Sequence, residues 1–229
     1  MKSADAIAEG VWKAYETAIS HADAAKVMFD SGNHALAASL AVLSAEEIGK
    51  MVNIDGLLFA HRETSRKKDH DDAFMKHSTK LSSSLTFPWF FFYLSRFDPG
   101  QSRGSDFETI QTILHHHVDE WANLGKVFGS DFDIRDLNRL KQSGLYSQQT
   151  ENESYQAPAE LVTKEQATAV LNYVRNMAEG LKLIFPGIFE KYREGLRDLQ
   201  ANLTGEEWTG VNQTALNFVG NMVEKVKAK

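Results

Sequence analysis

Three ionisable residues that suit acid–base chemistry lie close together within the segment 36–58. At about 100° per residue, the large apolar residues of this segment fall on one face of an α-helix, which predicts a helix packed against a core. Glu47 falls in the middle of that face, and Glu46 and Lys50 lie on its flank. Either carboxylate can meet the ammonium of Lys50, at a spacing of four or three residues. The predicted apolar face consists of Leu36, Leu40, Leu43, Met51, Ile54 and Leu58.

Two interpretations of these acids remain open. A carboxylate among leucines is costly unless a partner compensates its charge, which favours a functional group at this position. The alternative is structural: the stem of the glutamate packs against the core while its carboxylate reaches water.

A second pair, His77 and Lys80, lies on the flank of another expected helix. A histidine within reach of a carboxylate can act as general base and acid in phosphodiester cleavage, and a lysine can offset charge on a phosphate oxygen. RNA supplies its own nucleophile, the 2′-hydroxyl, so this chemistry needs no metal. The spacing alone does not decide between RNA cleavage and a structural, hydrogen-bonded histidine.

Composition narrows the class of protein. With 42% hydrophobic and 24% charged residues over 229 positions, the chain reads as an ordinary soluble globular protein. It has no cysteine, which excludes disulfides and thiolate metal sites. No apolar run is long enough for a membrane span or a secretory signal, so we expect a cytoplasmic protein without a membrane partner. The net charge of −6 argues against non-specific binding to nucleic acid. Candidates for a local basic groove are Arg62, Arg66, Lys67, Lys68, Lys76 and Lys80.

The pattern of apolar residues predicts an all-α protein with a single domain over residues 1–229. Helices are expected over Ala4–Asp30 and from Asn33 to about Arg62; the turn between them has only three residues, which predicts a tight antiparallel hairpin. The remaining expected elements are helices at about 71–85, 106–128 and from 133, a polar surface loop at 147–158, a long helix that starts at Thr163 and bends near Pro186, and a last helix after Gly205.

Two further clusters have structural interpretations. The aromatic run Phe87–Tyr93 fits burial or a subunit interface better than base stacking. His115, His116 and His117 point about 100° apart on a helix and cannot converge on one metal ion. The chain also has no glycine-rich phosphate loop and no serine-nucleophile motif, so we expect neither a cofactor nor a metal.

Several short motifs, in this order, are similar to those of a known family. They are Ala37–Lys50, with its Glu-Glu-Ile-Gly-Lys end, then Lys76–Leu81, then Leu140–Tyr146, and finally Pro158 with the helix start at Lys164–Ala167. Over roughly residues 14–180 the sequence resembles the AbiV group of bacterial abortive-infection proteins, within the HEPN superfamily.

The resemblance implies an antiparallel HEPN-like helical bundle at about 4–180, a C-terminal helical extension at about 181–229, and a homodimer. It also implies a role in halting growth of a phage-infected cell; in many HEPN relatives the dimer cleaves RNA. The usual HEPN nuclease signature has an arginine followed by a polar residue and then, a few positions later, a histidine. No pair in this sequence has that spacing, because Arg66 lies too close to His70 and Arg62 lies too far from it. The candidate catalytic residues are Glu46, Glu47, Lys50, His77 and Lys80, and the candidate binding residues are Arg62, Lys76, Lys141 and Tyr146.

Two functional hypotheses follow. In the first, the protein is an effector that acts on RNA or on the translation machinery through the candidate catalytic residues. In the second, it is a non-catalytic dimeric module that binds a phage or host protein, such as a phage-encoded activator, and Glu47 with Lys50 is a polar lock that fixes helix register.

Overall fold

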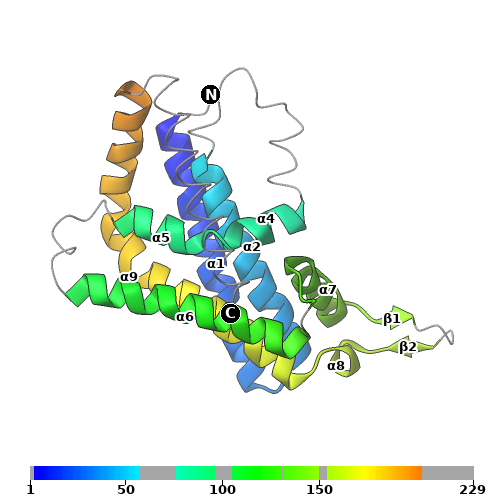
Figure 1. The fold of residues 1–229 in the computed structure, drawn as a ribbon. Coiled ribbons are helices and arrows are strands. Elements are labelled where there is room, and N and C mark those ends of the chain that lie inside the picture. Colours follow the sequence, from blue (N-terminus) through cyan, green and yellow to red (C-terminus); the bar gives the residue numbers. More distant parts are fainter. Residues whose placement is uncertain (1–2, 57–75, 96–104, 130, 150–153, 203–229) are drawn as a thin grey trace.

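The computed structural model describes residues 3–56, 76–95, 105–129, 131–149 and 154–202. Two long helices, α1 (Ala4–Asp30) and α2 (His34–Gly56), form an antiparallel hairpin at the centre of the molecule (Figure 1). Gly32 adopts a positive φ of 84° in the connecting turn, and the Asn33 side chain caps α2 by accepting from the Leu36 N–H at 3.1 Å. The predicted first helix and the tight hairpin are confirmed.

The other helices surround this pair. The short helices α4 (His77–Ser84) and α5 (Phe87–Ser95) follow one another across one face. Below them α6 (Ser105–Phe128) packs against the long helix α9 (Lys164–Asn202), and α7 (Ile134–Leu145) packs against α2 and α4. The prediction of an all-α fold is confirmed. No described helix is long and apolar enough to cross a membrane.

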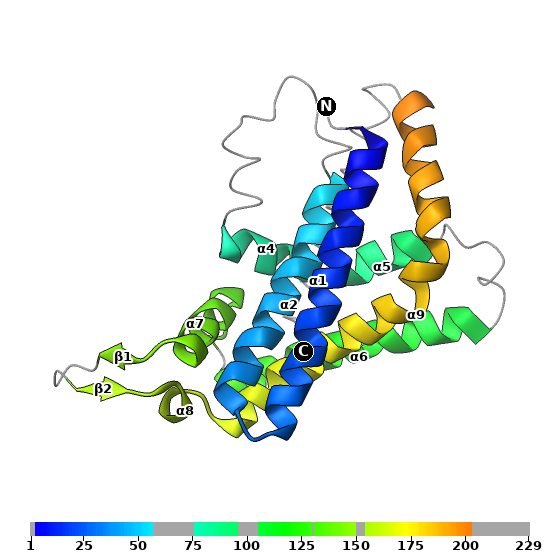
Figure 2. The same cartoon turned by 180° about the vertical axis from the view of Figure 1, so that it is seen from behind.

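Helix α9 holds the bundle together along the length of α1. It starts at the predicted position with a capping box, in which Thr163 Oγ1 accepts from the Gln166 N–H and Gln166 Oε1 accepts from the Thr163 N–H. An aromatic cluster joins α1 and α9 in the middle, where Trp12 lies 4.5 Å from Phe189 between ring centroids. Pro186 lies inside α9, which changes direction along its course (Figures 1 and 2). Helix α9 passes residue 180 without a break.

The segment expected as a polar surface loop, 147–158, also contains regular structure. It includes two short antiparallel strands, β1 (Gln148–Gln149) and β2 (Tyr155–Gln156), and ends at Pro158, the first residue of α8 (Pro158–Leu161). Both strands are exposed and project from the bundle beside α7 (Figure 2). Strands of two residues have no periodic pattern that a sequence could reveal.

Other expected elements are described only in part. Helix α2 ends at Gly56, and helix α4 begins at His77. Residues 57–75, which include Arg62, lie outside the described part of the chain. The expected last helix, after Gly205, also lies outside it. In α5, Pro88 sits in the first turn, where the missing N–H costs nothing, and Phe90 and Phe91 are fully buried, as the burial interpretation predicted.

Candidate acid–base site on α2, α4 and α7

Glu46 is the buried carboxylate at the centre of the candidate site. Its side chain is 2% exposed, whereas that of Glu47 is 15% exposed, so the prediction that Glu47 occupies the middle of the buried face was wrong. The physical reason is that α2 packs against α1, α4, α7 and α9 at once. Its buried face is built largely from small residues. Three of the four leucines of the predicted face, Leu36, Leu40 and Leu43, are only partly buried, and Leu58 lies outside the described residues.

His77, the first residue of α4, contacts Glu46 directly. Its Nδ1 lies 2.7 Å from Glu46 Oε2, although the two residues are 31 positions apart, and 48% of its side chain is exposed. An ionised carboxylate only accepts hydrogen bonds, so Nδ1 must carry a proton in this contact. In the neutral imidazole, Nε2 is then the unprotonated nitrogen and can accept a proton. Glu46 thus fixes the tautomer that a general base requires.

Lys141 on α7 is the second partner of Glu46. Its Nζ donates to Glu46 Oε1 at 2.5 Å and lies 3.1 Å from His77 Nδ1, and its side chain is 2% exposed. The ammonium compensates the buried charge of the carboxylate. We predicted Lys141 as a binding residue, and the structure places its side chain in a contact inside the protein.

Lys80 approaches the same carboxylate from α4, with Nζ 3.9 Å from Glu46 Oε2 and 11% of its side chain exposed. The site therefore combines one carboxylate, two ammonium groups and one imidazole. With a neutral imidazole it carries one net positive charge, although the whole chain has a net charge of −6. The first N–H groups of a helix have no partner within it, and Lys76, which precedes His77, provides no side-chain cap to α4. A positive charge beside such a helix start suits an anion.

Two glycines allow the helices to approach closely enough for these contacts. A Cβ at Gly49 would overlap the Lys80 carbonyl oxygen and lie 2.9 Å from the Ser84 N–H nitrogen, so α4 rests directly on the backbone of α2. A Cβ at Gly144 would overlap Ser39 Oγ and the Ala35 carbonyl oxygen, so α7 rests on α2 in the same way. Because α4 and α7 lie this close to α2, the side chains of His77, Lys80 and Lys141 can reach Glu46.

Four other predicted site residues, Glu47, Lys50, Lys76 and Tyr146, lie outside this cluster. Glu47 Oε2 accepts from Lys50 Nζ at 2.9 Å, and this pair is more exposed than the Glu46 cluster, with Lys50 35% exposed. Lys76 is exposed at the start of α4, and Tyr146 is 61% exposed just after α7. The pairing of Glu47 with Lys50 follows from their spacing, but the joining of Glu46, His77 and Lys141 does not.

The three consecutive histidines lie in different environments. His115 and His116 are exposed, whereas His117 is 4% exposed, and burial lowers its pKa to about 4. It packs against Tyr173, with ring centroids 5.0 Å apart. Within the described residues, no three His, Asp or Glu side chains are grouped so that they could hold a metal ion.

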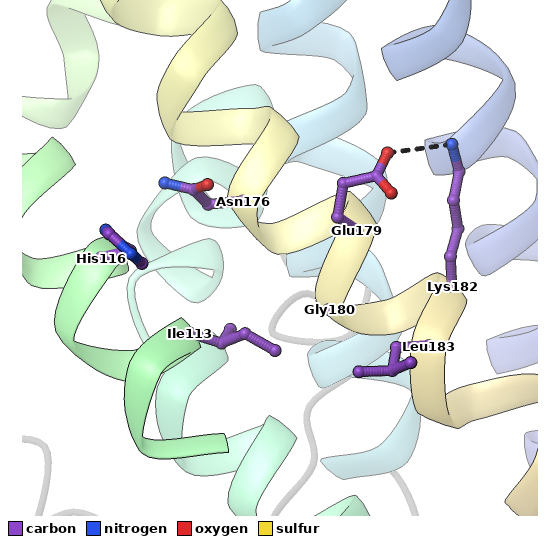
Figure 3. Close-up of a pocket in the computed structure, with 7 residues that line it drawn as sticks. All are labelled: Ile113, His116, Asn176, Glu179, Gly180, Lys182 and Leu183. Carbon is purple, nitrogen blue, oxygen red and sulfur yellow. Dashed lines mark hydrogen bonds and ion pairs between the residues drawn. The ribbon is translucent and has the colours of Figure 1, made fainter. Parts of the chain in front are cut away.

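A shallow pocket of about 430 Å³ lies between α6 and α9 (Figure 3). It contains none of the predicted site residues. Its cation, Lys182, is bonded to Glu179 at 3.2 Å and to Asp23 at 2.7 Å, so its charge is already compensated. The acid–base cluster on α2, α4 and α7 is the stronger candidate for chemistry.

The fold and the site define an all-helical bundle that holds a buried carboxylate against a half-exposed histidine. The chain belongs to the AbiV family of HEPN-type proteins, whose family model matches residues 6–179. This match includes Glu46, His77, Lys80 and Lys141, and it gives the protein a role in abortive infection. No curated protein and no solved structure matches the chain.

Proposed function

We propose that the protein arrests the growth of infected cells by cleaving RNA without a metal ion, with His77 as the general base. The observation that carries the proposal is the contact between Glu46 and His77. A carboxylate that is 2% exposed holds Nδ1 of a ring that is 48% exposed. The other ring nitrogen is therefore the proton acceptor offered by the neutral ring.

The proposed reaction is transesterification at a phosphodiester. His77 Nε2 takes the proton of the 2′-hydroxyl, the 2′-oxygen bonds to phosphorus, and the bond from phosphorus to the 5′-oxygen breaks. The leaving 5′-oxygen takes a proton from water, and the products are a 2′,3′-cyclic phosphate and a 5′-hydroxyl. Lys80 offsets the negative charge that grows on the phosphate oxygens. A protein that acts on cellular RNA works in the cytoplasm, and this location is part of the proposal.

The test compares the wild type with His77→Ala, both in bacteria and as purified protein. Induction of the wild type should arrest growth and produce new RNA fragments, and the purified protein should cleave RNA in the presence of EDTA. His77→Ala should do neither, with folding checked by circular dichroism. His116→Ala is the matched control, because His116 is an exposed histidine on α6. Cleavage by folded His77→Ala at the wild-type rate would refute the assignment.

A second function, binding without catalysis, has its own supporting observation. Tyr146, just after α7, is 61% exposed, and Tyr155, on β2 of the projecting β-hairpin, is 71% exposed. Exposed tyrosines are enriched at protein interfaces. In this proposal the surface binds a phage or host protein, and the Glu46 cluster only fixes the helices. Growth arrest that survives His77→Ala but is lost in the double variant Tyr146→Ser/Tyr155→Ser would favour it.

Homodimer formation is part of both proposals, and family membership supports it. Sedimentation equilibrium of the purified chain measures it directly. A mass of twice 25.7 kDa at micromolar concentration is the expected result, and a monomer at that concentration would contradict it.

A further inference from the structure

We infer that Lys141 is a positioning residue, which acts through Glu46 to keep His77 Nε2 free of a proton. This inference rests on the proposed function of His77, and it assigns a role to a side chain that no substrate can reach. The side chain of Lys141 is 2% exposed, and its ammonium contacts both Glu46 and His77.

The first step of the argument is charge balance. Glu46 is buried and needs a cation within hydrogen-bond distance. Lys141 and a protonated His77 can both supply one, whereas Lys80 Nζ lies 3.9 Å from Glu46 Oε2, beyond that distance. Lys141 Nζ, at 2.5 Å from Oε1, already supplies it. The same ammonium lies 3.1 Å from His77 Nδ1, where it disfavours a second positive charge. Both effects favour the neutral imidazole.

The second step is the direction of the hydrogen bond. While Glu46 is ionised, it can only accept, and Nδ1 must donate. Without Lys141, two outcomes are open to the pair. Either His77 becomes the cation and both its nitrogens carry protons, or Glu46 becomes protonated and donates a hydrogen bond to an unprotonated Nδ1, so that the single proton of the neutral ring is on Nε2. Nε2 is protonated in both outcomes, and the base is lost.

The third step concerns how the contacts of α7 with α2 position Lys141. Ser39 Oγ, fully buried on α2, donates to the Lys141 carbonyl at 3.1 Å and also lies 3.0 Å from the Ala35 carbonyl. Gly144, less than one turn further along α7, lies directly against the same two residues. The backbone of α7 is therefore fixed on α2 beside the lysine, and the long side chain has a defined origin from which it reaches Glu46.

The test determines which ring nitrogen of His77 carries a proton, by nitrogen NMR of the full-length protein labelled with ¹⁵N-histidine. The signal of His77 is identified by its loss in His77→Gln. In the wild type at neutral pH, Nδ1 should be protonated and Nε2 unprotonated. In Lys141→Met, Nε2 should be protonated at the same pH, and Lys141→Arg should restore the wild-type pattern because it keeps the charge. Lys182→Met, which removes a lysine paired with Asp23 on the other side of the bundle, should leave the His77 signal unchanged.

Lys141→Gln is a second variant, for use if Lys141→Met does not fold. The amide of the glutamine can still donate a hydrogen bond to Glu46, but the positive charge is absent. The same protonation of Nε2 is expected. RNA cleavage by either variant should fall by about 100-fold or more at neutral pH and recover as the pH rises and Nε2 loses its proton. A His77 ring whose Nε2 stays unprotonated in both variants would overturn the inference.

The outcomes separate this inference from the proposed function. The NMR pattern needs no RNA, so the predicted change in a protein that cleaves nothing would support the role of Lys141 and refute the nuclease. Cleavage that requires His77 but keeps its rate and pH profile in Lys141→Met would support the nuclease and refute the role of Lys141.

Discussion

The pair of Glu46 and Lys141 predicts a large coupling between two substitutions. Each side chain is 2% exposed, and the charged atoms are 2.5 Å apart. Removal of one partner leaves the other charge buried, which costs about 3–5 kcal/mol in comparable pairs, whereas replacement of both by uncharged residues is often neutral or stabilising. Glu46→Gln should therefore lower the free energy of unfolding by about 3–5 kcal/mol. The double variant Glu46→Gln/Lys141→Met should recover most of that loss.

The two single variants should not be equal. Lys141→Met leaves Glu46 with His77 at 2.7 Å and Lys80 at 3.9 Å, and both can carry positive charge. Glu46→Gln leaves two ammonium groups near each other without a carboxylate between them. We therefore expect Lys141→Met to cost about 3 kcal/mol or less and Glu46→Gln to be the more damaging change.

Urea unfolding of the four proteins, followed by circular dichroism, measures this cycle. At about 2–4 °C per kcal/mol for a chain of this size, a loss of about 3–5 kcal/mol is also visible as a fall of the melting temperature by roughly 6–20 °C. The matched control is the more exposed pair Glu47 and Lys50, for which Lys50→Met should cost only about 0–1 kcal/mol. Additive effects of Glu46→Gln and Lys141→Met, within about 0.5 kcal/mol, would refute the reasoning.

Three further predictions concern stability. Gly49→Ala should destabilise by about 1–3 kcal/mol or more in urea, since its Cβ overlaps the backbone of α4, whereas Gly125→Ala, with nothing within 4 Å, should stabilise by about 0.5–1 kcal/mol; equal effects would contradict the close approach. Burial raises the pKa of Asp55 to about 7, against an opposing hydrogen bond from Tyr192, so its folded form holds a proton that its unfolded form releases. Stability should then fall by about 4 kcal/mol in total as the pH rises from about 4 to 7, and Asp55→Asn should remove this component of the urea profile; an unchanged profile would refute it. Burial lowers the pKa of His117 to about 4, so its NMR signal should stay that of a neutral ring until about that pH, and the stability it contributes should be lost as the pH falls from about 6.5 to 4. A titration of His117 near pH 6.5 would show that the ring is not buried.

Much of the scaffold could be predicted because local signals agree with the fold. Gly32 and Asn33 mark the turn between α1 and α2, and Thr163 with Gln166 marks the start of α9. Each of these signals depends on residues within a few positions of each other, so a sequence displays it directly.

The site could be predicted only in part. His77 and Glu46 were both candidates, but the sequence placed Glu47 rather than Glu46 at the centre of the buried face. That error arose because large apolar residues were taken as the contact face of α2, while the real contacts with α4 and α7 are made by Ser39, Gly49 and other small residues. Small residues carry little hydrophobic signal but permit close approach of helices. Lys141 was named only as a candidate binding residue, because its partner Glu46 is 95 residues away in the sequence and no spacing rule reveals such a contact.

The spacing of the site along the chain has a consequence for synthesis of the protein. Glu46 and His77 are separated by 31 residues, and Lys141 follows His77 by another 64. A growing chain that has left the ribosome only as far as α4 contains the acid and the histidine but lacks α7 and its ammonium. The arrangement that we propose to be active therefore cannot form until residue 141 has emerged and folded back onto α2. On the proposed function, a nascent chain or a truncated product that ends before α7 is expected to cleave no RNA.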